Sequence, residues 1–373
     1  MSLYIMEEIM KRMNTRIACG VLAASLMMGV AGCSNAPEVD GTQVVATVNE
    51  EEITLGLASY ILRDQQAQTM DYYEMFSQNY GMDMSGISIW DEEAEDGTTY
   101  GEQAKTQVMD SLKSMYALKL HAADYDVELT EEEQAKITET AKVFIEKNDD
   151  KVLKALGVSE SDIAEYLSLV TLEHKLYAPV VADVDTKVSE KEANQTLITM
   201  SRISIEGTET DEDGNTIPLT EEELAEKKEL AQQVLDAVKA EDNIAEADMN
   251  AIAESISEDF ITTVPSFTTA GSEDDVLDKA VIEAALKVKD GELVPTVVEG
   301  EKAYFVVRMD AYFDEESTET KKATIIATRQ QEAYEAKLAE WVEAMEMTVN
   351  EDVWAQVKLT DSQPFVYKDE KAE

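Results

Sequence analysis

The chain has 373 residues, 44% of them hydrophobic, and its 79 acidic and 31 basic side chains give a formal net charge of −48. This length suits two or three domains, and the hydrophobic content excludes a disordered tail. The negative surface excludes nucleic acid and anionic lipid headgroups as partners, because both would be repelled. The acidity serves either solubility or the recognition of basic partners.

The first 32 residues have the layout of an export signal. Lys11, Arg12 and Arg16 precede an apolar run from Ile17 to Val30, as in the charged and apolar regions of a signal peptide. The run is shorter than the roughly 20 residues of a membrane-spanning helix, and no later segment approaches that length. We predict that residues 1–32 are a signal peptide and are removed.

The signal ends on Val30-Ala31-Gly32-Cys33, which resembles the bacterial lipobox, whose cysteine receives a diacylglycerol. Cys33 is therefore the predicted lipidation site, residues 33–42 are a lipidated tether, and the chain is expected on the extracytoplasmic face of the bacterial membrane. It would contact the membrane through this lipid anchor only. The alternative is an ordinary secretory signal that happens to end at a cysteine. Since Cys19 is the only other cysteine, no thiol would remain for a disulfide or a metal site.

A strand and a long helical region follow the tether. The β-branched residues from Val44 to Asn49 predict the strand. From Leu55 to about Val180 the apolar spacing is helical, so we expect an all-helical region there. Capping boxes indicate two of its helix starts, at Thr130 with Glu133 and at Ser159 with Asp162.

Methionine and aromatic residues are concentrated between Gln68 and Trp90. Such side chains make an adaptable apolar surface. The candidate binding surface consists of Met70, Tyr73, Phe76, Tyr80 and Met82. The alternative is that these residues fill the helical core, because apolar side chains at helical spacing usually face inward.

Residues 189–314 alternate between helical and strand-like patterns, which predicts a compact α+β module. A capping box at Ser189 with Glu192 opens its first helix. The predicted strands are Ile198–Ile205, Phe260–Thr268, Leu293–Val298 and Ala303–Asp310. The predicted helices are Glu221–Ala240, capped by Thr220 with Glu223, then Ala245–Ser255 and Asp275–Lys289.

The last long helix is expected from about Thr318 to Met347. Apolar residues recur there at threes and fours, among them Ile326, Tyr334, Leu338 and Trp341. No further element is left to cover this stripe, so we expect the helix to pack back on the N-terminal helices, which makes the module an insertion. The predicted domains are residues 43–188, an N-terminal helical segment; 189–314, the module; and 315–373, a C-terminal helix and tail packed on the N-terminal segment.

Four stretches carry a family resemblance. They are Val48 to Thr54, Ser257-Glu258-Asp259, Ala284 to Val297, and Trp341 to Trp354. In order and spacing they resemble the extracytoplasmic foldases of the PrsA and SurA type, in which helical chaperone segments flank a parvulin-like prolyl isomerase domain. The resemblance implies an α+β fold, with a helical chaperone domain built from N- and C-terminal segments and an inserted parvulin-like domain of a small antiparallel sheet plus helices.

The resemblance also implies a site in the module. Family members hold proline in an apolar pocket, beside two histidines and an Asp or Cys. They favour rotation about the X-Pro peptide bond, whose barrier is roughly 18 to 20 kcal/mol. The positions that match are Asp259 for the acid, Phe267, Leu277 and Val281 for the pocket, Arg202 for the first histidine, and Tyr304 or Phe305, according to alignment, for the second.

The two family histidines are thus absent. An arginine stays charged and cannot act as a neutral imidazole, and neither tyrosine nor phenylalanine restores the pair. We therefore expect weak or absent isomerase activity. Asp259 has either a retained polar role or that of a loop or helix-capping acid. The two histidines that the chain does have, His121 and His174, lie in the helical region and are expected to be ordinary packed or surface residues.

The leading functional hypothesis is a membrane-anchored chaperone that binds unfolded or nascent secreted proteins and needs no cofactor or metal. One alternative is an active peptidyl-prolyl isomerase that works through Asp259 and Tyr304. The other is a structural envelope lipoprotein with one fixed partner.

Overall fold

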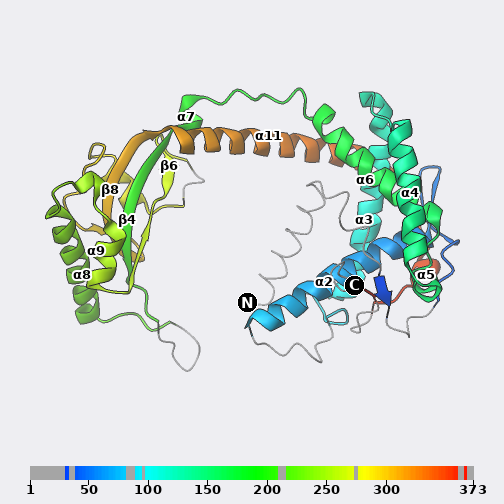
Figure 1. The fold of residues 1–373 in the computed structure, drawn as a ribbon, viewed down its shortest axis with the longest axis horizontal. Helices are drawn as coiled ribbons and strands as arrows, with labels where there is room; N and C mark the ends of the chain where they lie inside the picture. Colours follow the sequence, from blue (N-terminus) through cyan, green and yellow to red (C-terminus); the bar gives the residue numbers. More distant parts are fainter. Residues whose placement is uncertain are drawn as a thin grey trace. The chain divides into compact units, whose positions relative to one another are not determined.

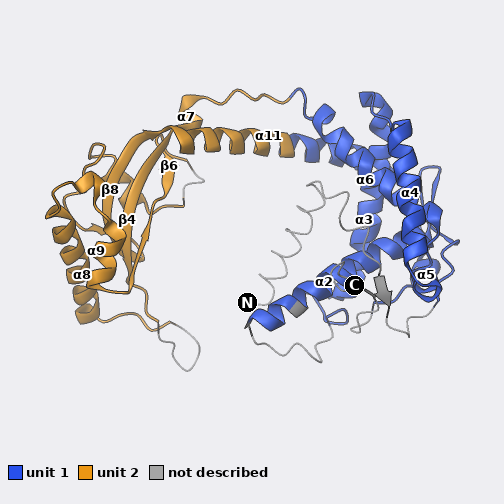
Figure 2. Ribbon diagram, viewed as in Figure 1, with its two compact units in different colours: residues 1–183, 332–373 blue, residues 184–331 orange. Residues whose placement is uncertain are grey.

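The computed structural model describes residues 30–32, 38–80, 89–94, 97–208, 216–272, 276–359 and 365–367. The fold is mixed α+β, mostly helical, with antiparallel sheets (Figure 1). The chain divides into two compact units: unit 1 comprises residues 1–183 and 332–373, and unit 2 comprises residues 184–331 (Figure 2). Most of the predicted signal peptide, and Cys33 itself, lie outside the described residues. Within the described residues, no helix has the length and apolar character needed to cross a membrane.

The strands of unit 1 join the beginning of the chain to its end. Strand β2 (Val44–Val48) pairs antiparallel with β3 (Glu51–Thr54) on one side and with β9 (Met347–Val349) on the other. Asn49 forms the turn after β2 with a φ of 51°, a backbone region that asparagine tolerates. Its N–H donates to the carbonyl of Glu346 at 2.8 Å. Strands β1 (Val30–Gly32) and β10 (Phe365–Tyr367) also pair antiparallel.

The helices of unit 1 are mostly amphipathic and bury their apolar faces against one another. They are α2 (Leu55–Tyr80), α3 (Tyr100–His121), the 3-10 turn η1 (Ala122–Tyr125), α4 (Glu131–Lys147), α5 (Asp150–Leu156), α6 (Glu160–Val180) and α12 (Glu351–Trp354). The predicted capping boxes at Thr130 and Ser159 are both complete. A third, Thr99 with Glu102 at the start of α3, was not predicted. The largest fully buried side chains include Leu57, Leu62, Leu112, Leu118, Ile163, Leu169 and Leu176.

Helix α11 (Glu315–Glu343) contributes its last part to unit 1, because the boundary between the units falls within it. Trp341 is buried, with its ring stacked on the His121 ring at a centroid distance of 4.7 Å and edge-on to Tyr125 at 5.7 Å. Tyr334 is buried beside Tyr177, with ring centroids 5.1 Å apart. The end of α11 therefore packs on η1, α6 and the last residue of α3.

Unit 2 is built on an antiparallel sheet with strand order β5-β4-β8-β7, and β6 also pairs with β4. Its strands are β4 (Gln195–Ser204), β5 (Phe260–Thr263), β6 (Ser266–Thr268), β7 (Val298–Glu299) and β8 (Ala303–Asp314). Its other elements are α7 (Glu190–Ala193), α8 (Glu221–Lys239), the 3-10 turn η2 (Ile244–Glu246), α9 (Met249–Ile256) and α10 (Lys279–Ala285).

Several predicted elements of the module differ from the observed ones. The strand predicted at 260–268 is interrupted at Pro265, which has no N–H to donate to a ladder. The helix predicted at 275–289 spans only Lys279–Ala285, with Asp278 capping its start. The strand predicted at 293–298 is reduced to Val298–Glu299 and an isolated bridge at Leu293. The helix predicted to open at Ser189 is only four residues long, although its capping box is complete.

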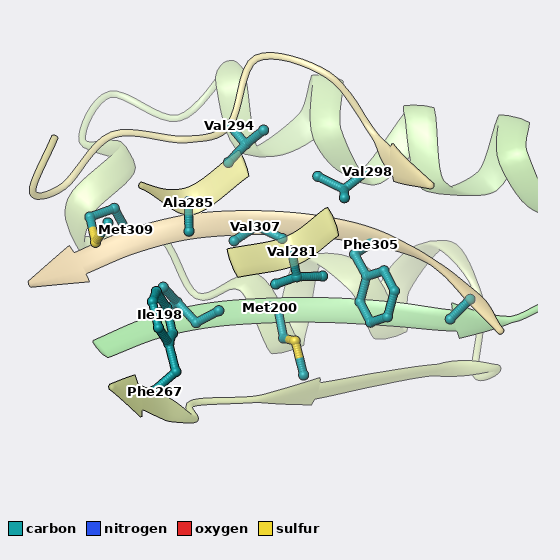
Figure 3. Close-up of a cluster of buried hydrophobic side chains, with 11 residues drawn as sticks. Ile198, Met200, Phe267, Val281, Ala285, Val294, Val298, Phe305, Val307 and Met309 are labelled. Carbon is teal, nitrogen blue, oxygen red and sulfur yellow. The ribbon is translucent and has the colours of Figure 1, made fainter. Parts of the chain in front are cut away.

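Each face of this sheet has its own apolar core. The α10-side core contains Ile198, Met200, Phe267, Val281, Ala285, Val294, Val298, Ala303, Phe305, Val307 and Met309 (Figure 3). The α8-side core contains Ile203, Ala231, Val234, Leu235, Val238, Met249, Ala253, Phe260, Leu293, Tyr304 and Val306. Adjacent residues of β4 and β8 alternate between the two cores because strand side chains alternate in direction.

Candidate functional site

The α10-side core brings the predicted pocket residues together. Phe267 from β6 and Val281 from α10 are both fully buried in it (Figure 3), and Leu277, which is partly buried, packs against it. Phe305 from β8 belongs to the same cluster. Leu277 is thus the only one of these four side chains with substantial solvent exposure.

The strand register places Tyr304 and Phe305 on opposite faces of the sheet. Arg202 of β4 pairs with Phe305, and Ile203 pairs with Tyr304. Directly paired residues of an antiparallel sheet point to the same face. Arg202 and Phe305 therefore share the α10 face, whereas Tyr304 is buried in the α8-side core. Of the two positions for the second family histidine, only Phe305 lies on the side of Arg202.

Asp259 faces helix α8. Its carboxylate lies 3.7 Å from the ammonium of Lys227 and is mostly exposed to solvent. Its backbone N–H donates to the hydroxyl of Ser257 at 3.2 Å. A solvated ion pair of this kind contributes at most about 1 kcal/mol. The structure thus brings Arg202, Phe305 and the pocket residues to one face of the sheet and leaves Asp259 and Tyr304 apart from them.

A buried polar network on the α8 face was missed from the sequence. The guanidinium of Arg308 donates to the Asp310 carboxylate at 2.6 Å and to the Thr199 hydroxyl at 3.1 Å. It also donates to the carbonyls of Ile244 and Ala247, at 3.0 and 2.8 Å. Arg308 therefore links β8 and β4 to the segment between α8 and α9. The available signal was an arginine inside an otherwise apolar strand, where a charge needs partners.

The second half of α2 carries the described part of the candidate binding surface. Its first half is largely buried as far as Ala67, but none of the described side chains between residues 68 and 79 is fully buried. Met70, Tyr73 and Phe76 are half-buried, and Met75 is 52% exposed. The Tyr72 ring stacks on Phe76, with centroids 6.4 Å apart. We call Met70, Tyr72, Tyr73, Met75 and Phe76 the Met–aromatic surface. Met82 and the side chain of Tyr80 lie outside what the structure describes.

The Met–aromatic surface reaches toward the start of α3. Burial, and then the neighbouring Tyr100, Glu92 and Tyr72, raise the pKa of the Tyr73 hydroxyl. The ring of Tyr73 meets that of Tyr72 edge-on at 6.3 Å. These side chains are thus apolar rings with polar tips, a composition suited to contacts with varied polypeptides.

Unit 1 also contains a buried carboxyl that the sequence did not reveal. Glu173 lies on α6, and burial raises its pKa to about 7. Neither its Oε2 atom nor the Tyr334 hydroxyl has a hydrogen-bond partner in the described part of the chain. The pKa of Tyr334 is raised by burial and then by Glu173 and Tyr177, and that of Tyr166 by burial and then by Asp64 and Glu173. The Glu173 carboxyl therefore changes charge near neutral pH inside the helical unit.

The described residues hold no group of three or more histidine, cysteine or acidic side chains placed to bind a metal ion.

No protein-family model matches the chain. It is 23% identical over 333 residues to the foldase protein PrsA of Clostridium botulinum strain Loch Maree, covering 84% of this chain and 90% of that protein. The PrsA of strain Langeland is also 23% identical, with the same coverage. Two solved PrsA structures are similar: that from Bacillus cereus covers 73% of this chain and 94% of its own, with 18% identity and a TM-score of 0.29. That from Streptococcus pneumoniae covers 76% and 95%, with 17% identity and a TM-score of 0.26. From the sequence likeness over most of both chains, this protein is a distant homologue of the PrsA foldases.

Proposed function

We propose that the chain is an extracytoplasmic chaperone that binds unfolded or nascent secreted proteins on unit 1. The observation that carries this proposal is the Met–aromatic surface, where α2 leaves the core and carries apolar side chains that are exposed or half-buried. Adaptable apolar surface of this kind can bind many sequences. The distant homology to PrsA foldases supports the same assignment.

The direct experiment uses residues 33–373, with Cys33 replaced by serine, and a reduced protein that aggregates as it unfolds. Aggregation is followed by light scattering with increasing amounts of the chain. We expect suppression at near-stoichiometric ratios, because each client molecule would occupy one apolar surface. No effect at an equimolar ratio would contradict the proposal.

The chain is further proposed to be anchored through a lipid on Cys33, within the sequence Val30-Ala31-Gly32-Cys33. In a bacterial host, Cys33→Ser is expected to abolish incorporation of a labelled fatty acid and to release the protein from the membrane fraction. Equal labelling of both forms would refute lipidation at this residue. If the unaltered protein is neither labelled nor found in the membrane fraction, residues 1–32 are an ordinary secretory signal.

Unit 2 is proposed to be a parvulin-like module with weak or lost isomerase activity. Its apolar residues Phe267, Leu277 and Val281 gather in one cluster. Arg202 and Phe305, which are paired on the same face, match the two histidine positions of the family by resemblance. A guanidinium and a phenyl ring cannot exchange a proton near neutral pH as imidazoles do. In a refolding assay limited by proline isomerisation, we expect little or no acceleration.

An active isomerase is the second candidate, favoured by the clustering of those same pocket residues. It predicts a clear acceleration of the proline-limited phase that Leu277→Ser, at the partly buried edge of the cluster, reduces. If the acceleration is present but Leu277→Ser leaves it unchanged, the α10 face is not its site.

A further inference from the structure

Strand β5 lies at one edge of the sheet in unit 2. It pairs with β4, and the strand order β5-β4-β8-β7 gives it no second neighbour among the described residues. An outer strand presents a row of backbone N–H and C=O groups that can pair with an added chain.

Two hydrogen bonds fix which residues of β4 bond to which neighbour. The N–H of Ile198 donates to the carbonyl of Pro265 at 3.1 Å, on the β5 and β6 side. The N–H of Ile205 donates to the carbonyl of Lys302 at 2.9 Å, on the β8 side. Because bonding direction alternates along a strand, even-numbered residues of β4 bond toward β5 and odd-numbered residues bond toward β8.

The free backbone groups of the edge follow from this alternation. Ile261 pairs with Arg202, an even-numbered residue, so its N–H and C=O bond inward to β4. Thr263 pairs with Met200, also an even-numbered residue, so it bonds inward in the same way. Thr262 and Val264 are the sequence neighbours of Thr263, so their N–H and C=O groups point away from the sheet. Neither N–H donates to a backbone carbonyl in the described part of the chain.

The side chains of this edge are uncharged, and its two apolar ones are exposed. The run Ile261-Thr262-Thr263-Val264 contains no charged residue, and Ile261 is 51% exposed and Val264 59% exposed. Sheet edges are commonly protected by lysine, proline, inward-pointing charges or bulges. The proline after this run, Pro265, accepts from Ile198 through its carbonyl, so its missing N–H lies on the side of β4 and not on the outer side. Arg202, exposed and directly paired with Ile261, is the neighbouring charge on the same face, and it makes no ion pair with the described residues.

We infer that β5 binds an extended segment of an unfolded client as an added antiparallel or parallel strand. One apolar client side chain lies beside Ile261 on the α10 face and another beside Val264 on the α8 face, and an acidic client side chain faces Arg202 on the α10 face. The inference rests on the proposed chaperone function and names a second client site, in unit 2. Charge selects the occupant: a second copy of this chain carries a net charge of −48 and is repelled. An isolated client segment has no such penalty and supplies the carboxylate that Arg202 lacks.

The test measures binding of a fluorescein-labelled ten-residue peptide to residues 33–373 by fluorescence anisotropy. The peptide consists of valine and threonine, with valines on both faces of the extended strand and one central glutamate. Thr262→Pro removes an outward N–H without removing a bond to β4. Thr262→Val is the matched control, since it loses the hydroxyl contact to Ser201, an Oγ–Oγ distance of 2.8 Å, but keeps the N–H. We expect Thr262→Pro to weaken binding about tenfold or more and Thr262→Val to change it less than about twofold. Equal affinities for the two variants would overturn the inference.

If circular dichroism shows that Thr262→Pro unfolds the module, a charge reversal at Arg202 tests the β5 inference instead. Arg202→Glu should weaken binding of the glutamate peptide and strengthen binding of a peptide with lysine in place of the glutamate. If Arg202→Glu leaves the ratio of the two peptide affinities unchanged, the acidic client side chain does not face Arg202. On peptide addition, hydrogen exchange should slow at the amides of Thr262 and Val264, and unchanged exchange there would overturn the edge site.

Different results would contradict the proposed function and the β5 inference. If the unaltered chain does not suppress aggregation, the proposed function fails, whatever the peptide does. If it suppresses aggregation but peptide affinity is the same in Thr262→Pro and Thr262→Val, only the β5 inference fails.

Discussion

Replacing Glu173 by glutamine tests the buried carboxyl of helix α6. Burial raises its pKa from 4.5 to about 7, and at about 1.4 kcal/mol per pH unit this corresponds to roughly 3 kcal/mol of stability that changes with pH. Glutamine has nearly the same shape and stays neutral. The comparison of the two proteins therefore isolates the cost of charging this one group.

The sign of the effect follows from proton linkage. Below pH 4.5 the carboxyl is protonated in both the folded and the unfolded state, so it contributes no pH dependence. Between pH 4.5 and about 7 the unfolded state releases the proton while the folded state keeps it, so stability falls as pH rises. Glu133, whose pKa is lowered to about 2 by the hydrogen bond from Lys175 and then by Thr130, acts in the opposite direction, but below this window.

The assay is urea unfolding followed by tryptophan fluorescence at several values from pH 5 to pH 8. All three tryptophans, Trp90, Trp341 and Trp354, belong to unit 1, so the signal reports the unit that contains Glu173. We expect Glu173→Gln to gain up to about 3 kcal/mol relative to the unaltered protein as pH rises across this range. The other titrating groups are common to both proteins and cancel. Parallel stability profiles would refute the assigned burial.

Three further experiments test the contacts of each unit by substitution. Trp341→Ala should cost about 3 to 5 kcal/mol in urea unfolding because it leaves a cavity, whereas His121→Ala, which removes only its stacking partner, should cost about 1 kcal/mol; equal losses would contradict the packing described. Arg308→Met should cost about 3 to 5 kcal/mol, seen as faster hydrogen exchange of β8 amides, and adding Asp310→Leu should restore part of it; no change in exchange would show that the network is not needed. Asp259→Ala should leave the rate of proline-limited refolding unchanged and the free energy of unfolding within about 1 kcal/mol of the unaltered protein. If the unaltered protein accelerates this refolding and Asp259→Ala does not, Asp259 belongs to the site.

Local signals in the sequence predicted the helix starts well. The capping boxes at Thr130, Ser159 and Thr220 are all complete in the structure, because each depends on hydrogen bonds between residues three apart. Strand limits were predicted less well, since they depend on distant partners. The carbonyl of Pro265 accepts from Ile198, a pairing that no pattern within residues 260–268 indicates.

The site was predictable only as a set of positions. Whether Tyr304 or Phe305 lies beside Arg202 depends on the register between β4 and β8, and a shift of one residue exchanges the two faces. Phe267 belongs to the core of the module, and in sequence a pocket residue and a core residue look the same. Glu173 interacts with Tyr334, on a helix far along the chain, so its environment has no local signature in the sequence.

Binding of unfolded protein by the Met–aromatic surface is tested most directly by replacing two of its apolar side chains. The double variant Met75→Ser/Phe76→Ser is compared with Leu120→Ser, which replaces an apolar side chain of the same unit that is 42% exposed and lies on α3 outside that surface. Light scattering of an aggregating reduced client is measured with each. The double variant should lose most of the suppression, whereas Leu120→Ser should retain it. Equal suppression by both variants would contradict client binding at the Met–aromatic surface.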